Sequence, residues 1–87
     1  MFIITYDISN EKRLKNIAKI CESYLIRVQK SVFEGDLTKS QLHILQEKLT
    51  KTMDKEEDSI IIYFVARASF KRKKAYGKNV EDPYLII

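Results

Sequence analysis

The rest of the chain is organised around the N-terminal residues Met1-Phe2-Ile3-Ile4-Thr5-Tyr6-Asp7, an apolar run that ends on an acid. Side chains on a β-strand alternate between two faces, so Phe2, Ile4 and Tyr6 are expected to share one face. Asp7 is then expected on the opposite face, at the end of the strand. Residues 1–7 are therefore predicted to form a strand that places a carboxylate at its C-terminal end.

Asp7 is followed by a helix start, since Ser9 or Asn10 can cap a helix whose first turn carries Glu11. This places Asp7 at a strand-to-helix junction, where a substrate or a metal ion could approach. Aspartate also favours such positions because it accepts hydrogen bonds from loop and helix-start amides. From these residues alone, a functional and a purely structural role for Asp7 are both open.

Length and composition indicate one globular domain over residues 1–87. The chain is 45% hydrophobic and 32% charged, with two Gly and one Pro. A chain of this length buries only roughly 60% of its unfolded surface, so association with a partner would help it.

The sequence predicts a cytoplasmic protein that does not cross a membrane. No apolar run approaches the ~20 residues needed to span a bilayer, and the N-terminus lacks the pattern of a signal peptide. Cys21 is the only cysteine, and its place in a helical apolar pattern predicts a small core residue rather than a nucleophile.

Two amphipathic helices are predicted. Over residues 11–23, apolar side chains recur on one helical face and basic ones, Arg13 and Lys15 among them, lie elsewhere; such basic residues are most often simply solvated. Over residues 39–53, the helix begins with a Thr38-x-x-Gln41 capping box. His43, the only histidine, falls on this helix with no Cys or Asp nearby, which indicates a surface residue and not a catalytic one.

Residues 25–34 follow a period of two and predict two short strands with a turn near residues 29–31. One face would hold Ile26, Val28 and Val32, and the other Arg27, Gln29, Ser31 and Phe33. A face that combines Arg, an aromatic ring and hydroxyls is typical of contact with another subunit or with nucleic acid.

The run Ile60-Ile61-Ile62-Tyr63-Phe64-Val65 predicts a strand that must be covered on both sides. Strand, helix, two strands, helix and strand is the ferredoxin-like βαββαβ order, an α+β fold with both helices on one face of an antiparallel sheet. A second copy of the chain is expected on the opposite face, which would hold Asp7, Arg27, Phe33 and half of the last strand.

A basic segment, residues 66–79, carries six of the sixteen basic residues and no acid, while the rest of the chain has ten basic and twelve acidic residues. Its cations are Arg67, Lys71, Arg72, Lys73, Lys74 and Lys78. A local charge of this kind indicates a polyanion as partner, although a solvated basic loop is the alternative.

The chain ends with the apolar run Tyr84-Leu85-Ile86-Ile87, which predicts a fifth strand over residues 84–87. Pairing with the sheet edge of a partner copy would bury this strand.

Several of these stretches together resemble the CRISPR-associated Cas2 family of spacer-acquisition proteins. They are Tyr6-Asp7 at the end of the first strand, Arg27-Val28-Gln29-Lys30-Ser31-Val32-Phe33-Glu34, Leu37-Thr38, Asp58-Ser59 and the closing Tyr84-Leu85-Ile86-Ile87. The resemblance covers nearly the whole chain, but Arg13 and Lys15 match the basic helix positions of the family only loosely. Residues 70–74 lie in a region that varies within the family.

The resemblance implies a ferredoxin-like homodimer with facing sheets, in which two copies of Asp7 hold Mg²⁺ or Mn²⁺ and Asp7 is the catalytic residue. We expect nucleic-acid contacts from Arg13, Lys15, Arg27, Lys71, Arg72, Lys73 and Lys74. Support for the dimer or the site is expected from Tyr6, Ser31, Phe33, Leu85 and Ile86. The implied partners are the Cas1 integrase and double-stranded DNA, with RNA as a further nucleic-acid partner.

Two functions follow from these expectations. The favoured one is a DNA-binding protein that scaffolds the integrase during spacer acquisition, because the chain offers no second acid near Asp7, no suitable histidine and no evident general base. The alternative is a metal-dependent endonuclease that cleaves RNA or DNA. A third function, a small-molecule sensor, lacks a Gly-rich phosphate loop to support it.

Overall fold

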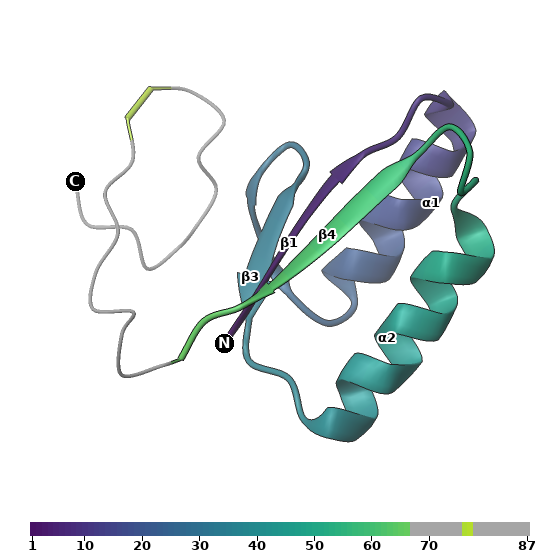
Figure 1. The fold of residues 1–87 in the computed structure, drawn as a ribbon. Coiled ribbons are helices and arrows are strands. Elements are labelled where there is room, and N and C mark those ends of the chain that lie inside the picture. The colour runs from purple at the N-terminus through teal and green to yellow at the C-terminus, as the bar shows by residue number, and fades with distance from the viewer. Residues whose placement is uncertain (67–75, 78–87) are drawn as a thin grey trace.

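The computed structural model describes residues 1–66 and 76–77 and shows two layers, a sheet with both helices packed on one face (Figure 1). The elements are β1 (Phe2–Asp7), α1 (Glu11–Glu22), β2 (Ile26–Gln29), β3 (Val32–Gly35), α2 (Lys39–Thr52) and β4 (Ser59–Phe64). This order confirms the predicted α+β, ferredoxin-like βαββαβ fold.

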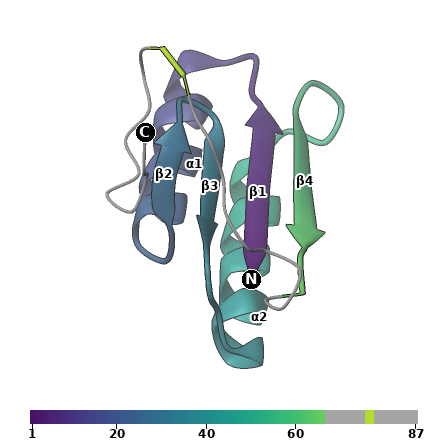
Figure 2. The ribbon, with the colours of Figure 1, turned by 90° about the vertical axis from the view of Figure 1, so that its left-hand side faces the viewer.

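The sheet has the strand order β2-β3-β1-β4, and every neighbouring pair is antiparallel. Figure 2 looks onto the sheet with the helices behind it and shows β1 between β3 and β4. The N-terminal strand is therefore central, while β2 and β4 form the edges of the sheet in the part of the chain that the structure describes.

Both helices begin as their capping residues predict. Asn10 is the N-cap of α1 and accepts a hydrogen bond from the Arg13 amide at 2.9 Å. At the start of α2 the capping box is complete, because the Gln41 amide donates to Thr38 Oγ1 at 3.1 Å and the Thr38 amide donates to Gln41 Oε1 at 3.0 Å.

The core lies between the helices and the sheet. Its buried members include Ile4 and Tyr6 from β1, Ile17 and Cys21 from α1, Phe33 from β3, and Leu45 and Leu49 from α2. The predicted apolar faces of both helices are thus the ones that pack on the sheet. Cys21 is fully buried, which agrees with its predicted role as a core residue, and burial raises the pKa of its thiol to about 12.

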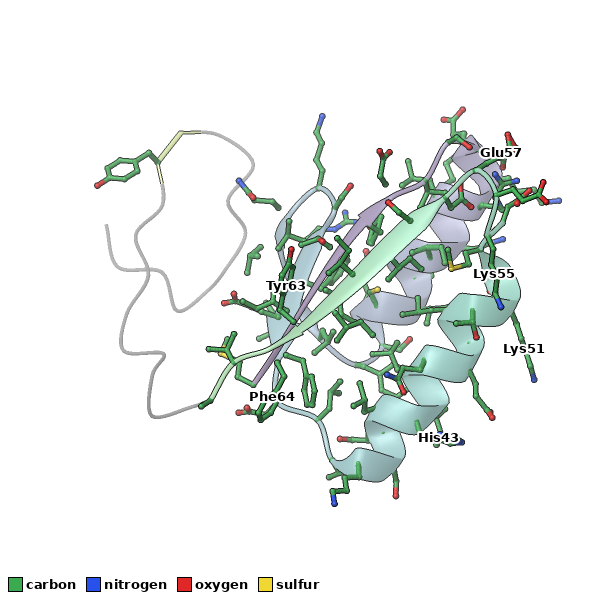
Figure 3. All side chains as sticks on the ribbon, in the orientation of Figure 1. His43, Lys51, Lys55, Glu57, Tyr63 and Phe64 are labelled. Atoms are coloured by element: carbon green, nitrogen blue, oxygen red, sulfur yellow. The ribbon has the colours of Figure 1, made fainter. Side chains whose placement is uncertain are left out.

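The other side of the sheet, which we call the open face, carries no helix from the described part of the chain. The register assigns to it Ile3, Thr5 and Asp7 of β1, Ile26 of β2, Val32 and Glu34 of β3, and Ile61 and Tyr63 of β4. Figure 3 shows Tyr63 on the side of the sheet away from both helices. Ile26, Ile61 and Tyr63 are 38%, 49% and 49% exposed, so this face is markedly apolar for a surface.

The predicted face of Arg27 and Phe33 is wrong. Phe33 is fully buried on the helix-covered side because it pairs with Ile4 of β1, and Arg27, the partner of Phe33 on β2, lies over the Phe33 ring. The alternation had grouped these two residues correctly but assigned them to the wrong side of the sheet. Asp7 and half of β4 do lie on the open face as predicted.

Some predicted features lie outside the described residues, namely the strand over 84–87 and most of the basic segment, of which only residues 66, 76 and 77 are described. Among the described residues, neither helix has the length and apolar character required to cross a membrane.

Replacing the buried ring at the centre of the sheet should destabilise the fold. We expect Phe33→Ala to lower the free energy of unfolding by about 3–5 kcal/mol, because it opens a cavity beside Ile4 and Tyr6. The matched control is Phe64→Ala, since Phe64 is 72% exposed and should cost less than about 1 kcal/mol. Urea unfolding at one protein concentration measures both, and equal losses would contradict the assigned burial.

Candidate functional site

Asp7 ends β1 on the open face, opposite Ser59 of β4, and its side chain is exposed. Within residues 1–66 and 76–77 no hydrogen bond or ion pair to the Asp7 carboxylate is found. The helix cap that follows is Asn10, so Asp7 does not serve the amides of α1. The structural role that the sequence left open for Asp7 is therefore filled by another residue.

The described part of a single chain supplies few ligands for a metal ion. No group of three or more His, Cys, Asp or Glu side chains in the described part of the chain could hold one. Mg²⁺ prefers oxygen ligands and retains several waters, so it needs only one or two carboxylates from a protein. The exposed oxygens of Asp7, which have no partner in the described part of the chain, fit such an ion as one half of a site that a second chain would complete.

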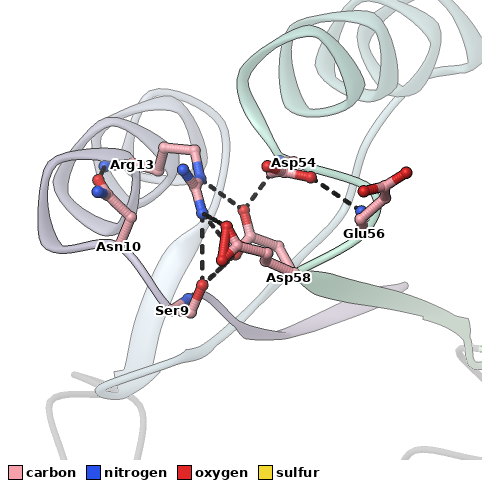
Figure 4. Close-up of polar contacts among 7 residues, drawn as sticks. Ser9, Asn10, Arg13, Asp54, Glu56 and Asp58 are labelled. Atoms are coloured by element: carbon pink, nitrogen blue, oxygen red, sulfur yellow. Dashed lines mark hydrogen bonds and ion pairs between the residues drawn. The ribbon is translucent and has the colours of Figure 1, made fainter.

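A second aspartate, Asp58, lies close to this junction in a very different environment (Figure 4). Its side chain is fully inaccessible to solvent. Asp58 Oδ1 accepts from the amide of Ser9 at 3.0 Å, and Oδ2 accepts from Arg13 Nε at 2.8 Å and from the Asp54 amide at 2.9 Å. We call these four residues the Asp58 cluster.

The Asp58 cluster joins three segments of the chain: the turn after β1, the first turn of α1 and the loop before β4. The Arg13 guanidinium, together with the donated amides of Asp54 and Ser9, holds the pKa of the Asp58 carboxyl well below its usual range. The carboxylate therefore stays ionised and fully hydrogen-bonded at neutral pH.

Arg13, predicted to contact nucleic acid, is a member of this cluster and is held by the Asp58 carboxylate. A further 3.7 Å ion pair joins its Nη2 to Glu57, and its side chain is 25% exposed. Lys15, by contrast, is exposed on α1. The structure thus gives Arg13 a structural role, and its contact with nucleic acid stays a prediction.

Tyr6, Arg27 and Phe33 form a second group, on the helix-covered side behind Asp7. The Tyr6 and Phe33 rings stack with centroids 6.1 Å apart, and the Arg27 guanidinium lies 5.2 Å from the Phe33 centroid. Burial raises the pKa of the Tyr6 hydroxyl, which donates to the Lys30 carbonyl at 3.3 Å. These residues support the strand that carries Asp7 and lie on the face away from it.

Ser31 contributes through its backbone, because its carbonyl accepts from the Tyr6 amide at 3.1 Å. Six further predicted site residues lie outside the described part of the chain, and they are Lys71, Arg72, Lys73, Lys74, Leu85 and Ile86. Their contacts stay predictions.

Sequence reasoning did not find the role of Asp58. It closes the acidic run Asp54-Lys55-Glu56-Glu57-Asp58, in which nothing local distinguishes it from its neighbours. The one available signal was position, since Asp58 directly precedes the buried strand β4 and a carboxylate there needs a cationic partner.

Comparison with known proteins gives a consistent result. A family model described as "CRISPR associated protein Cas2" matches residues 1–73. The chain is 43% identical to the CRISPR-associated endonuclease Cas2 of Halalkalibacterium halodurans, over 99% of both chains. It is 37% identical to CRISPR-associated endoribonuclease Cas2 1 of Moorella thermoacetica, over 90% of this chain and 86% of that one. The crystal structure of Streptococcus pyogenes Cas2 superposes with a TM-score of 0.78 at 34% identity, covering 87% of this chain and 98% of that one.

The lowered pKa of Asp58 predicts acid-sensitive stability. An unfolded aspartate titrates near pH 4, so the contribution of Asp58 is complete above about pH 4 and is lost as the pH falls towards its folded-state pKa. Asp58→Asn should destabilise the protein at neutral pH and flatten the loss of stability below about pH 4. Glu57→Gln, an exposed neighbour, is the control and should leave the profile unchanged. Urea midpoints across this pH range measure it, and a wild-type acid profile in Asp58→Asn would assign the effect to other carboxyls.

Proposed function

Because this chain belongs to the CRISPR-associated Cas2 family, we propose that it is a nucleic-acid-binding homodimer that cleaves phosphodiester bonds with a divalent ion shared by two Asp7 carboxylates. The observation that carries the proposal is Asp7 itself, an exposed carboxylate at the end of the central strand for which residues 1–66 and 76–77 supply no partner. The relatives named as endonuclease and endoribonuclease support phosphodiester cleavage as the reaction.

Dimerisation through the open face is supported by its apolar side chains. Ile61 and Tyr63 of β4 and Ile26 of β2 are large and substantially exposed, and burying them would remove apolar surface from water. Most homodimers have two-fold symmetry, in which each residue near the axis meets its own copy. Two sheets packed face to face near β1 would bring the two Asp7 carboxylates together.

The Asp7 oxygens of both chains would hold Mg²⁺ or Mn²⁺ in this arrangement. A bound ion of this kind polarises a phosphate and lowers the pKa of its bound water. The described residues form no group of three or more His, Cys, Asp or Glu side chains around Asp7. Because the described residues offer no such cluster to share the work of a base, we expect slow cleavage that depends strictly on the metal.

A second function, a duplex-DNA scaffold for the Cas1 integrase, is favoured by a separate observation. The six cations of the basic segment, residues 66–79, give a local positive charge on a chain whose remainder has ten basic and twelve acidic residues. Charge of this distribution suits the phosphates of a duplex without sequence preference. The scaffold function requires the dimer and the basic segment but not the Asp7 charge, so the two functions can be separated by experiment.

A charge placed on the open face should separate the two chains. We expect Ile61→Glu to shift the protein to a monomer in sedimentation at micromolar concentration, because burying an unpaired carboxylate at an interface is costly. Ile44→Glu is the matched control, since Ile44 is 44% exposed on α2, away from the open face, and should leave the dimer intact. A wild-type monomer, or a dimer that survives Ile61→Glu, would remove the basis for a shared site.

Asp7→Asn separates cleavage from binding. The amide keeps the size of the side chain but lacks the charge that a divalent ion requires, so metal-dependent cleavage of DNA and RNA should be lost. Duplex affinity should persist, and if about six phosphates are neutralised its logarithm should fall against log salt with a slope near −5. Glu11→Gln, an exposed acid in the first turn of α1, is the control. Full cleavage by Asp7→Asn would exclude Asp7 as the essential ligand.

A further inference from the structure

We infer that Asp58 is a positioning residue for Asp7: the buried Asp58 carboxylate fixes the turn after β1 and so sets where the Asp7 carboxylate lies on the open face. This inference rests on the proposed function, because it concerns the same metal ligand. It assigns to Asp58 a task beyond stabilising the fold.

The Asp7 side chain depends on its backbone for its position. Among the described residues nothing hydrogen-bonds or pairs with the Asp7 carboxylate, and it stands exposed at the last paired position of β1. A side chain held by neighbours would tolerate a small backbone shift, whereas an unsupported one moves with the backbone.

The backbone is fixed on both sides of Asp7, by different means. Before it, the Tyr6 amide donates to the Ser31 carbonyl at 3.1 Å, which continues the pairing towards β3. After it, the regular ladder has ended, and the Ser9 amide donates to Asp58 Oδ1 at 3.0 Å. The Ser9 hydroxyl also lies 3.3 Å from the same oxygen. After Asp7, the hydrogen bond to Asp58 therefore fixes the backbone in the way that strand pairing fixes it before Asp7.

The Asp58 carboxylate can fix this turn because it is itself rigidly held. It is inaccessible to solvent, and Arg13 approaches it with Nε at 2.8 Å and Nη2 at 3.3 Å, the two-pronged geometry that fixes orientation as well as distance. The Asp54 amide adds a third anchor, on the loop before β4. Ser59, the residue after Asp58, is the partner of Asp7 on β4. The segment that anchors the turn after β1 therefore also pairs with the last residue of β1.

The two-fold symmetry of the proposed dimer would increase the effect of any displacement of the Asp7 carboxylate. Mg²⁺ accepts ligands only near 2.0–2.1 Å and in nearly ideal geometry, so a displacement of a few tenths of an ångström matters. In a shared site both carboxylates would be displaced at once. Groups that orient a ligand typically change metal affinity about 10- to 100-fold when they are removed.

The test measures metal binding without catalysis. Mn²⁺ is titrated into the purified dimer and its free signal is followed by electron paramagnetic resonance, at a temperature where every variant is folded by circular dichroism. Asp58→Asn should weaken Mn²⁺ binding about tenfold or more. Glu57→Gln makes the same chemical change one residue earlier, where the carboxylate is exposed and contacts Arg13 only at 3.7 Å, and it should bind as the wild type does.

Further variants keep the inference falsifiable. Arg13→Lys preserves the charge but removes the Nε donor, so it should weaken Mn²⁺ binding in the same direction, and it replaces Asp58→Asn if that variant does not fold. Wild-type affinity in the folded Asp58 and Arg13 variants, with binding lost in Asp7→Asn, would overturn the positioning role and leave the proposed function standing. Equal Mn²⁺ binding by the wild type and Asp7→Asn would overturn both.

Discussion

Pairing of β1 with β3 on one edge and with β4 on the other determines how the whole sheet is arranged. Because β3 and β4 align with the same strand, the alternation of β1 determines which face every residue of its neighbours occupies. Ile4 and Tyr6 point to the helices, and Phe33 and Ile62 must then do the same. Asp7, one residue beyond Tyr6, is directed to the open face by the same alternation. The core and the candidate site are two consequences of one register.

The sequence predicted the elements well because their signals are local: Thr38 and Gln41 form a capping box, and the helical apolar faces are regular. The side of Arg27 and Phe33 was not predicted, because it depends on pairing across the sheet. A charged residue suggested a solvated or contact face, whereas the guanidinium lies over a buried ring and reaches Glu22 at the end of α1. The role of Asp58 depends on contacts with residues more than forty positions away, which no local pattern encodes.

Asp7 and Asp58 are both aspartates, but their environments suit them to opposite roles. Asp58 is enclosed and accepts hydrogen bonds from three segments, so it has no capacity left for another ligand. Asp7 is exposed, and no described residue uses its acceptor capacity. The proposed ion would bind only the exposed carboxylate of Asp7, and the enclosed carboxylate of Asp58 would hold Asp7 in place. Since each chain brings one such open carboxylate, the chemistry and the association of the chains cannot be separated in the proposed enzyme.

Cys21 is enclosed on the face of α1 that packs on the sheet, and this determines how readily its thiol reacts. Thiols react as thiolates, and a fully buried thiol whose pKa is raised to about 12 is scarcely ionised near neutrality. Cys21 is the only cysteine, so no other thiol competes for a thiol reagent. Its rate of modification is then set by how often α1 separates from the sheet, and the chain contains its own probe for the opening of that one helix.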